Sequence, residues 1–541
     1  MTIRFEIDRN GRDGTLAGLC AWASLAAMVA GCGSVPARND ADGGVVGIGA
    51  PTDGASGDVP VATDGGGSGG ATGRGGTTGT NDGGADRGAG GIDGGAGSTG
   101  AAGTTGAGGA GPTCTGAGIC GRGPTGIFCA QSNGATAFTS WSSWSPNFSD
   151  SQTWKSLQAY WATIQFPDLN GDGRADICGR GSAGIYCSLS TGAGAFAAPS
   201  YWSPSYTDTN GWAAFPYYWG TIQFPDVNGD GKADVCGRAG DGIYCGVSNG
   251  IDGFGPVNLW IANFADAGAW NSTQAYWGTI QFADVNGDLK ADVCGRGSSG
   301  VYCALSNGTT AFGDLNLWQA QYSDAAGFAG SPSFWATLAF PDITGDGKAD
   351  LCARTTGGLY CALSNGTNGF GPANLWSTDY ANAGDWHTNQ AYWGTIQYPD
   401  LNGDGKADVC GRGIGGLVCG ISNGTSGFGT PATWASTFSD AAGFTTDATN
   451  WGTIQYPDLN GDGKADVCGR ASTGVICGLS NGTSAFATAN WLDQFTDTNG
   501  WRTDLSYGAT LQTANLNVTG CRAVTKRSTF SQPLVRRLAP F

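Results

Sequence analysis

The sequence predicts an all-β protein: a seven-bladed β-propeller of 58-residue repeats, preceded by a disordered Gly-rich linker. Three observations predict this fold. An aspartate-rich segment recurs every 58 residues, seven pairs of cysteines recur with the same period, and each unit contains about four short β-type segments. Four-stranded units repeated four to eight times in series are typical of propellers. An open β-solenoid is the alternative, but its coils are usually shorter than 58 residues.

Each unit shows the local pattern of strands and turns. In the first complete unit, TIQFPDLN, ADICGRG and GIYCSLS are β-branched or alternating runs separated by Gly and Asp, and the segment around a repeated Trp adds a fourth strand. No stretch has helical periodicity. Seven units extend from residue 114 to residue 519.

The two ends of the repeat region complement each other. The first hairpin, at Cys120, has no aspartate loop before it, whereas the last unit continues into Tyr507–Gln512, which matches the strand preceding each loop. We therefore expect the C-terminal strand to complete the blade that the N-terminal hairpin begins. Asn515, Asn517 and Thr519 replace the usual Asp, Asn and Asp of the loop at this seam, so no metal is expected there.

The N-terminal residues 1–32 read as an export signal, because three arginines precede an apolar run from Leu16 to Ala30. The run ends in VAGC and resembles the lipobox of bacterial lipoproteins, which implies lipidation of Cys32. An ordinary cleaved signal or a short membrane anchor is the alternative. Residues 33–113 are rich in Gly, Ala and Thr and predict a disordered linker. Residues 520–541 form a basic tail, for which we expect disorder.

Composition disfavours several classes of function. The chain has 42 Asp but a single Glu and a single His, and its formal net charge is −17. The shortage of Glu and His disfavours familiar hydrolase mechanisms, and the negative charge disfavours binding to nucleic acid or to an anionic membrane surface. The prediction is therefore a non-enzymatic binding module that contacts a membrane only through an N-terminal lipid.

The aspartate loops have the pattern of calcium ligands. Oxygen-bearing side chains occupy positions 1, 3, 5 and 9, and position 6 is a Gly that permits a sharp turn. A metal-free Asn-Gly or Asp-Gly turn is the alternative, but six copies with three carboxylates each favour about six structural Ca²⁺ ions. Leu289 at position 6 and Thr344 at position 3 depart from the pattern and predict weaker binding. The predicted ligands are Asp168, Asn170, Asp172, Asp176, Asp226, Asn228, Asp230, Asp234, Asp284, Asn286, Asp288, Asp292, Asp342, Thr344, Asp346, Asp350, Asp400, Asn402, Asp404, Asp408, Asp458, Asn460, Asp462 and Asp466.

The cysteines predict seven hairpin disulfides. Cys178 and Cys187 are nine residues apart, and a tight turn at Ser182–Ala183 would place their sulfurs opposite each other. The other six pairs have the same spacing, and a zinc or copper thiolate site is the alternative. Cys114 and Cys521 remain, and we hypothesise that they form a disulfide across the seam. Disulfides indicate an oxidising, extracytoplasmic location, periplasmic or at the cell surface.

The segment FPDVNGDGKADVCGRAGDGIYCGVSNGIDGFGPVNLW resembles the FG-GAP or VCBS-type repeat. It is similar to the repeat of integrin α-subunit propellers and to that of seven-bladed tandem-repeat lectins. The resemblance implies calcium in the loop between the first and second strands of each blade, and for the lectin relatives it implies sugar sites between blades or at loop ends. The cysteine pairs depart from the aliphatic residues usual in this family.

Carbohydrate, or a cell-surface glycan, is the predicted ligand. Candidate ligand-binding residues are aromatic or basic positions that recur in the units: Trp212, Trp270, Trp386, Trp501, Arg180, Arg238, Arg296 and Arg412. The alternatives are that the rings form the inter-blade core and that the arginines make structural hydrogen bonds. Two further functions remain open: an integrin-like adhesion propeller that binds protein, and an enzyme that uses paired aspartates such as Asp208, Asp266, Asp324 and Asp440.

Overall fold

The computed structural model describes residues 117–444 and 447–516, which belong to a compact unit that spans Thr104–Phe541. A second unit, Met1–Gly103, lies outside the described residues. The predicted signal and Cys32, the linker, Cys114, Cys521 and the basic tail also lie outside them. Within the described ranges no helix has the length and apolarity that crossing a membrane requires.

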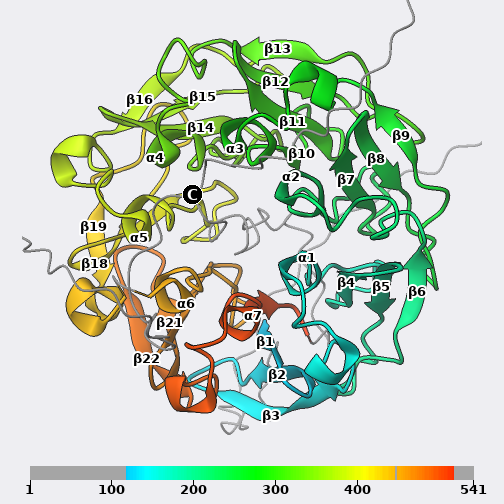
Figure 1. Cartoon of the computed structure of the whole chain (residues 1–541). Helices are drawn as coiled ribbons and strands as arrows, with labels where there is room; N and C mark the ends of the chain where they lie inside the picture. The colour runs from blue at the N-terminus through cyan, green and yellow to red at the C-terminus, as the bar shows by residue number, and fades with distance from the viewer. Residues whose placement is uncertain (1–116, 445–446, 517–541) are drawn as a thin grey trace, which may run out of the picture. The chain divides into compact units, whose positions relative to one another are not determined.

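The described chain forms seven antiparallel sheets arranged in a ring, as a seven-bladed propeller requires (Figure 1). Blades 1 to 7 are numbered along the chain by their central hairpins, and the strands of each blade are counted from the innermost to the outermost. The second strands are β1 (Gly118–Gly123), β4 (Ile177–Gly181), β7 (Val235–Ala239), β11 (Asp292–Gly297), β14 (Leu351–Thr355), β17 (Val409–Gly413) and β20 (Val467–Ala471). The third strands are β2 (Gly126–Ser132), β5 (Gly184–Ser188), β8 (Gly242–Gly246), β12 (Gly300–Ala304), β15 (Gly358–Ala362), β18 (Gly416–Gly420) and β21 (Gly474–Ser480). The outer strands are β3 (Phe138–Ser145), β6 (Ser200–Ser203), β9 (Asn258–Ile261), β13 (Asn316–Gln319), β16 (Asn374–Ser377), β19 (Ala432–Ala435) and β22 (Phe486–Leu492).

The innermost segment of each blade is short. It forms a strand in blade 4, as β10 (Gln281–Ala283), and in blade 1, as β23 (Gln512–Ala514). In the other five blades it makes a single bridge to the second strand, as Gln165 does to Cys178 in blade 2. The predicted four strands per unit are therefore three named strands and one inner segment that is often reduced to a bridge.

The ring closes at the predicted seam. Strand β23 pairs antiparallel with β1, with Gly118 opposite Ala514 and Cys120 opposite Gln512, so the last strand of the ring completes the first blade. The order β23-β1-β2-β3 is the same as β10-β11-β12-β13 in blade 4. The closure inferred from the complementary ends of the sequence is confirmed.

All seven predicted hairpin disulfides are present. Each joins directly opposed residues of the second and third strands, with Cα–Cα distances of 4.1 to 4.2 Å, and all fourteen cysteines are buried. In blade 2 the strands end at Gly181 and restart at Gly184, which leaves the two-residue turn Ser182–Ala183 that the spacing predicted. The metal-thiolate alternative is therefore wrong for these pairs.

Seven one-turn helices precede the innermost segments and lie toward the axis of the ring (Figure 1). They are α1 (Gln158–Trp161), α2 (Pro216–Trp219), α3 (Gln274–Trp277), α4 (Pro332–Trp335), α5 (Gln390–Trp393), α6 (Ala448–Trp451) and α7 (Leu505–Gly508). Four residues are too few to show a helical period, so the sequence pattern did not reveal them. Short 3₁₀ turns follow several outer strands: η1 (Asp150–Gln152), η2 (Asp266–Gly268), η3 (Asn382–Gly384), η4 (Ser436–Phe438), η5 (Asp440–Ala442) and η6 (Asp497–Asn499).

Backbone hydrogen bonds join every blade to the next through the aspartate loops. The N–H of Ala233 in blade 3 donates to the carbonyl of Asp168 in blade 2 at 2.8 Å. The equivalent bond recurs at each of the seven junctions, and at the seam Ala117 donates to Asp458 and Ala175 to Asn515. The loops therefore form one continuous ring that fixes each blade against its neighbour.

Candidate functional site

Each aspartate loop is folded around the carboxylate of its first residue. In blade 2, Oδ1 of Asp168 accepts the N–H of Gly171 at 2.8 Å, and Oδ2 accepts the N–H of Gly173 at 2.8 Å. Both glycines have positive φ, 74° and 81°, which a residue with a side chain rarely adopts. Leu289 in blade 4 takes the second of these conformations with φ 74°, so that loop keeps its shape without the glycine.

The aspartate at position 9 anchors the loop in the core. The side chain of Asp176 is fully buried, and its two oxygens accept the N–H groups of Leu169 at 2.9 Å and Ser190 at 2.6 Å. Burial raises the pKa of Asp176 to about 7. The equivalent residues of the other loops have the same contacts and the same pKa: Asp234, Asp292, Asp350, Asp408 and Asp466.

The aspartate at position 5 pairs with the cation two residues later. Asp230 accepts a bond of 2.7 Å from Nζ of Lys232, and the other loops repeat this pair, with Arg174 as the cation in blade 2. The side chain at position 3 lies against the same residue, since Oδ1 of Asn228 accepts the N–H of Asp230 at 3.0 Å. Positions 3 and 5 therefore lie together on the exposed part of the loop.

The loops supply calcium-type donors but do not converge on one point. Among residues 117–444 and 447–516, no group of three or more Asp, Glu, His or Cys side chains is arranged to hold a metal. The carboxylates at positions 1 and 9 accept hydrogen bonds from backbone N–H groups, and the carboxylate at position 5 forms an ion pair with a lysine or arginine. The oxygen donors nonetheless suit Ca²⁺ in type. Calcium binding at these loops stays a prediction.

The predicted ligand-binding residues Trp212, Trp270, Trp386 and Trp501 lie in the core, each 5 to 6% exposed. Each ring fills the wedge between two blades and faces a glycine. A Cβ added at Gly237 would lie 2.9 Å from the ring of Trp212, and the same close approach joins Gly295 to Trp270, Gly411 to Trp386 and Gly121 to Trp501. The prediction that these rings contact a ligand was therefore wrong, and the inter-blade core alternative is confirmed.

The predicted ligand-binding residues Arg180, Arg238, Arg296 and Arg412 are fully buried, and that prediction was also wrong. Nη2 of Arg238 pairs with Asp266, Nε donates to the carbonyl of Phe264 at 2.6 Å, and Nη1 donates to the carbonyl of Tyr217 at 3.3 Å. These bonds tie the second strand to the crossover after the outer strand and to the helix. The arginines therefore make structural hydrogen bonds.

A tyrosine completes this buried network in five blades. In blade 2, Tyr160 donates from its hydroxyl to Oδ2 of Asp208 at 2.5 Å, while Arg180 pairs with Oδ1. Partial burial, together with this hydrogen bond, raises the pKa of Tyr160 to about 12, so the hydroxyl stays protonated and donates. Asp266, Asp324 and Asp440 are held in the same way. The repeated aspartates considered as catalytic pairs thus form ion pairs with arginine and accept hydrogen bonds from tyrosine.

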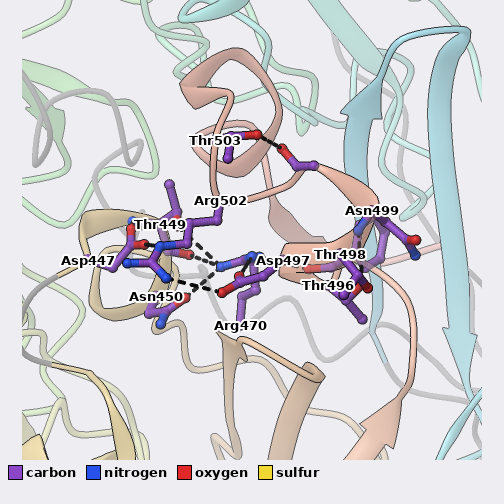
Figure 2. Close-up of polar contacts among 12 residues, drawn as sticks. Asp447, Thr449, Asn450, Arg470, Thr496, Asp497, Thr498, Asn499, Arg502 and Thr503 are labelled. Atoms are coloured by element: carbon purple, nitrogen blue, oxygen red, sulfur yellow. Dashed lines mark hydrogen bonds and ion pairs between the residues drawn. The ribbon is translucent and has the colours of Figure 1, made fainter. Parts of the chain in front are cut away.

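Blade 7 departs from this pattern and is drawn in Figure 2. Asn450 stands where the other helices have tyrosine or phenylalanine, and its Oδ1 accepts a bond of 2.5 Å from Arg470. The exposed Arg502 pairs with Asp447 at 2.8 Å and approaches Asp497 at 3.7 Å, so its guanidinium replaces the missing hydroxyl. Asp447, Asn450, Arg470 and Asp497 each have a hydrogen-bond or ion-pair partner in this cluster. Arg502 therefore compensates for the replacement of the tyrosine by Asn450.

Three aromatic side chains that sequence reasoning missed are exposed: Trp141 at 39%, and Tyr201 and Phe215 at 45% each. Trp141 stacks on Phe128 with a centroid distance of 4.9 Å, and Phe215 stacks on Tyr217 at 4.8 Å. None of them occupies a position that is aromatic in every unit. In the sequence these three residues stand out because they interrupt the repeat, whereas the candidate ligand-binding residues were chosen because they recur in the units.

Comparison with known proteins agrees with this architecture. The family model of the FG-GAP-like repeat matches residues 168–237 and 342–411, so the chain contains FG-GAP-like repeats. A lectin from Agrocybe aegerita, described as recognising non-reducing terminal N-acetylglucosamine, superimposes with a TM-score of 0.65 and 25% identity over 74% of this chain and 96% of the lectin. No curated protein matches the sequence significantly.

Two other solved structures overlap less well. The Photorhabdus luminescens Tc holotoxin pore is 15% identical over 66% of this chain and 17% of its own, with a TM-score of 0.39. The Vibrio cholerae biofilm matrix protein Bap1 is 17% identical over 50% of this chain and 38% of its own, with a TM-score of 0.23. At these TM-scores neither similarity bears on function.

The close contact between the repeated glycine and the repeated tryptophan, such as Gly237 and Trp212, gives a first prediction. Gly237→Ala is expected to lower the free energy of unfolding by about 1–3 kcal/mol, because the added methyl group collides with Trp212. Adding Trp212→Phe should recover part of that loss, since blade 5 naturally combines Ala353 with Phe328 in one buried cluster. Denaturant unfolding of the two single variants and the double variant measures the coupling. Strictly additive losses would contradict a direct contact.

Proposed function

We propose that this FG-GAP-repeat propeller is a multivalent carbohydrate-binding module. The observation that carries the proposal is the superposition on a lectin that recognises terminal N-acetylglucosamine, which covers nearly the whole of that lectin. Exposed aromatic side chains on more than one blade support it, because Trp141 on β3 and Tyr201 on β6 could each engage a sugar and so make the binding multivalent. The buried residues of the repeat hold the blades together, so the proposed sugar contacts are exposed residues.

The exposed aromatic rings are the proposed stacking surfaces. A pyranose ring has an apolar face that packs on the flat face of an aromatic side chain, while neighbouring polar groups bond its hydroxyls. Phe128 with Trp141, and Phe215 with Tyr217, each form a near-parallel pair with interplanar angles of 9° and 7°. A pre-stacked pair is rigid, which lowers the entropy lost when a ligand binds.

Calcium in the six loops is part of the proposal, with a structural role. The residues that would hold it are the oxygen-bearing side chains at positions 1, 3, 5 and 9 of each loop. Bound Ca²⁺ would supply positive charge to carboxylates that otherwise repel one another. Because each loop is hydrogen-bonded to the next blade, an ion that stiffens the loop also stiffens the junction.

We further propose an extracytoplasmic location with a lipid anchor at Cys32. Seven buried disulfides are typical of a protein that folds in an oxidising compartment. The anchor rests on the lipobox-like VAGC sequence alone.

A glycan array at millimolar calcium tests sugar binding. We expect binding to glycans with terminal N-acetylhexosamines, and weaker binding by Trp141→Ala, Tyr201→Ala and Phe215→Ala. Ile251→Ala and Ile414→Ala are matched controls, because these side chains are exposed but aliphatic, at 73% and 72%. Absence of glycan binding by a folded protein that still attaches to cells would instead favour a protein ligand.

Metal removal gives a separate prediction. Elemental analysis of the purified protein is expected to find about six calcium ions per chain, and chelation should lower the melting temperature. Asp226→Asn with Asp230→Asn should remove one ion, whereas Asp241→Asn, outside the loops, should remove none. A metal-free protein that melts at the same temperature with and without chelator would refute calcium binding and leave the glycan proposal standing.

A further inference from the structure

Blade 5 is the one described blade whose buried arginine has no carboxylate partner. Six arginines pair with an aspartate, as Arg296 does with Asp324 in blade 4. In blade 5 the equivalent position is Asn382, and Nη2 of Arg354 donates to its Oδ1. The remaining partners of this guanidinium are neutral: the carbonyl of Tyr380 at 2.7 Å, and the carbonyl and hydroxyl of Ser333 at 3.4 and 3.2 Å.

The charge of Arg354 is therefore uncompensated. Its side chain is fully buried, and burial lowers the pKa of the guanidinium to about 10, so it remains protonated at neutral pH. A buried charge without a counter-ion is costly, because it has lost its hydration and gained no opposite charge in return. In blade 4, by contrast, the arginine and the aspartate together are neutral.

A second substitution accompanies the first and changes the surface above the arginine. Where five blades have a tyrosine that donates to the second aspartate oxygen, α4 has Phe334, which has no hydroxyl. Because arginine can only donate, the amide of Asn382 must turn its oxygen toward Arg354. Its Nδ2 then occupies the place of the second oxygen, and no partner for it is found among the described residues. Asn382 itself is half-exposed.

The local chemistry of blade 5 is thus reversed with respect to blade 4. Blade 4 presents a carboxylate oxygen already satisfied by Tyr276, whereas blade 5 presents a free N–H donor above an unneutralised cation. A donor with positive charge behind it favours an anionic acceptor. The chain as a whole has a net charge of −17, so any preference for an anion must come from a local feature of this kind.

Resting on the proposed function, we infer that blade 5 is a subsite for the carboxylate of an acidic sugar, with Asn382 donating to the carboxylate and Arg354 supplying the field. The other blades would take neutral sugars only. The ring would then combine general glycan binding with one position that selects uronic-acid-type residues.

Isothermal titration with a glucuronic-acid-terminated trisaccharide and its glucose-terminated counterpart tests the inference. The wild-type protein should bind the acidic ligand about tenfold more tightly, since hydrogen bonds to charged groups are worth at least this factor. Phe334→Tyr with Asn382→Asp, which gives blade 5 the arrangement of blade 4, should abolish the preference. Tyr276→Phe with Asp324→Asn, which gives blade 4 the arrangement of blade 5, should add a second acid-selective site. Melting temperatures confirm that each variant folds.

Equal affinity of the wild type for the two ligands, or an acid preference that survives Phe334→Tyr with Asn382→Asp, would overturn the inference. Competition by acetate as strong as that by free glucuronate would also overturn it, because the site would then select a bare anion and not a sugar. Failure to bind either trisaccharide would count against the proposed function as well. Binding of both ligands with equal affinity would count against this inference alone.

Discussion

The propeller depends on the burial of seven arginine side chains. Each guanidinium is removed from water, so each of its donors needs an acceptor inside the protein. Arg238 satisfies this need with groups from the crossover and the helix, which come from different parts of the unit. One side chain therefore fixes the position of three elements. The one-turn helices and the turn-rich connections have little regular hydrogen bonding of their own, so this contact holds them against the paired strands.

The period of 58 residues was sufficient to predict the number of blades and all seven disulfides, and the complementary ends of the repeat region predicted the closure of the ring. These features depend on spacing and on matches between repeats, which can be read directly from a sequence. The roles of Trp212 and Arg238 could not be read in this way. A residue recurs when every unit needs it, and a wedge-filling ring recurs as regularly as a sugar-binding one would. The recurrent tryptophans predicted to bind a ligand instead pack between blades, and the recurrent arginines donate structural hydrogen bonds.

The informative positions are those that interrupt the repeat. Asn382 and Phe334 change together in one blade, and Asn450 changes with Arg502 in another, but the two cases differ. In blade 7 a new charged group restores the balance, whereas in blade 5 nothing does. The sequence displays both exceptions, since the replaced tyrosine and aspartate are visible at the expected spacing. Their meaning requires the structure, because only the contacts show which exception is compensated.

The buried arginine of each blade has a structural role, and the free energy of unfolding of Arg238→Met tests that role most directly. Methionine preserves much of the volume but cannot donate to Asp266 or to the carbonyls of Phe264 and Tyr217. The account predicts a loss of about 3 kcal/mol or more, because removing one partner leaves buried polar groups unsatisfied. Wild-type stability combined with lost glycan binding would contradict the account and return this arginine to the ligand site.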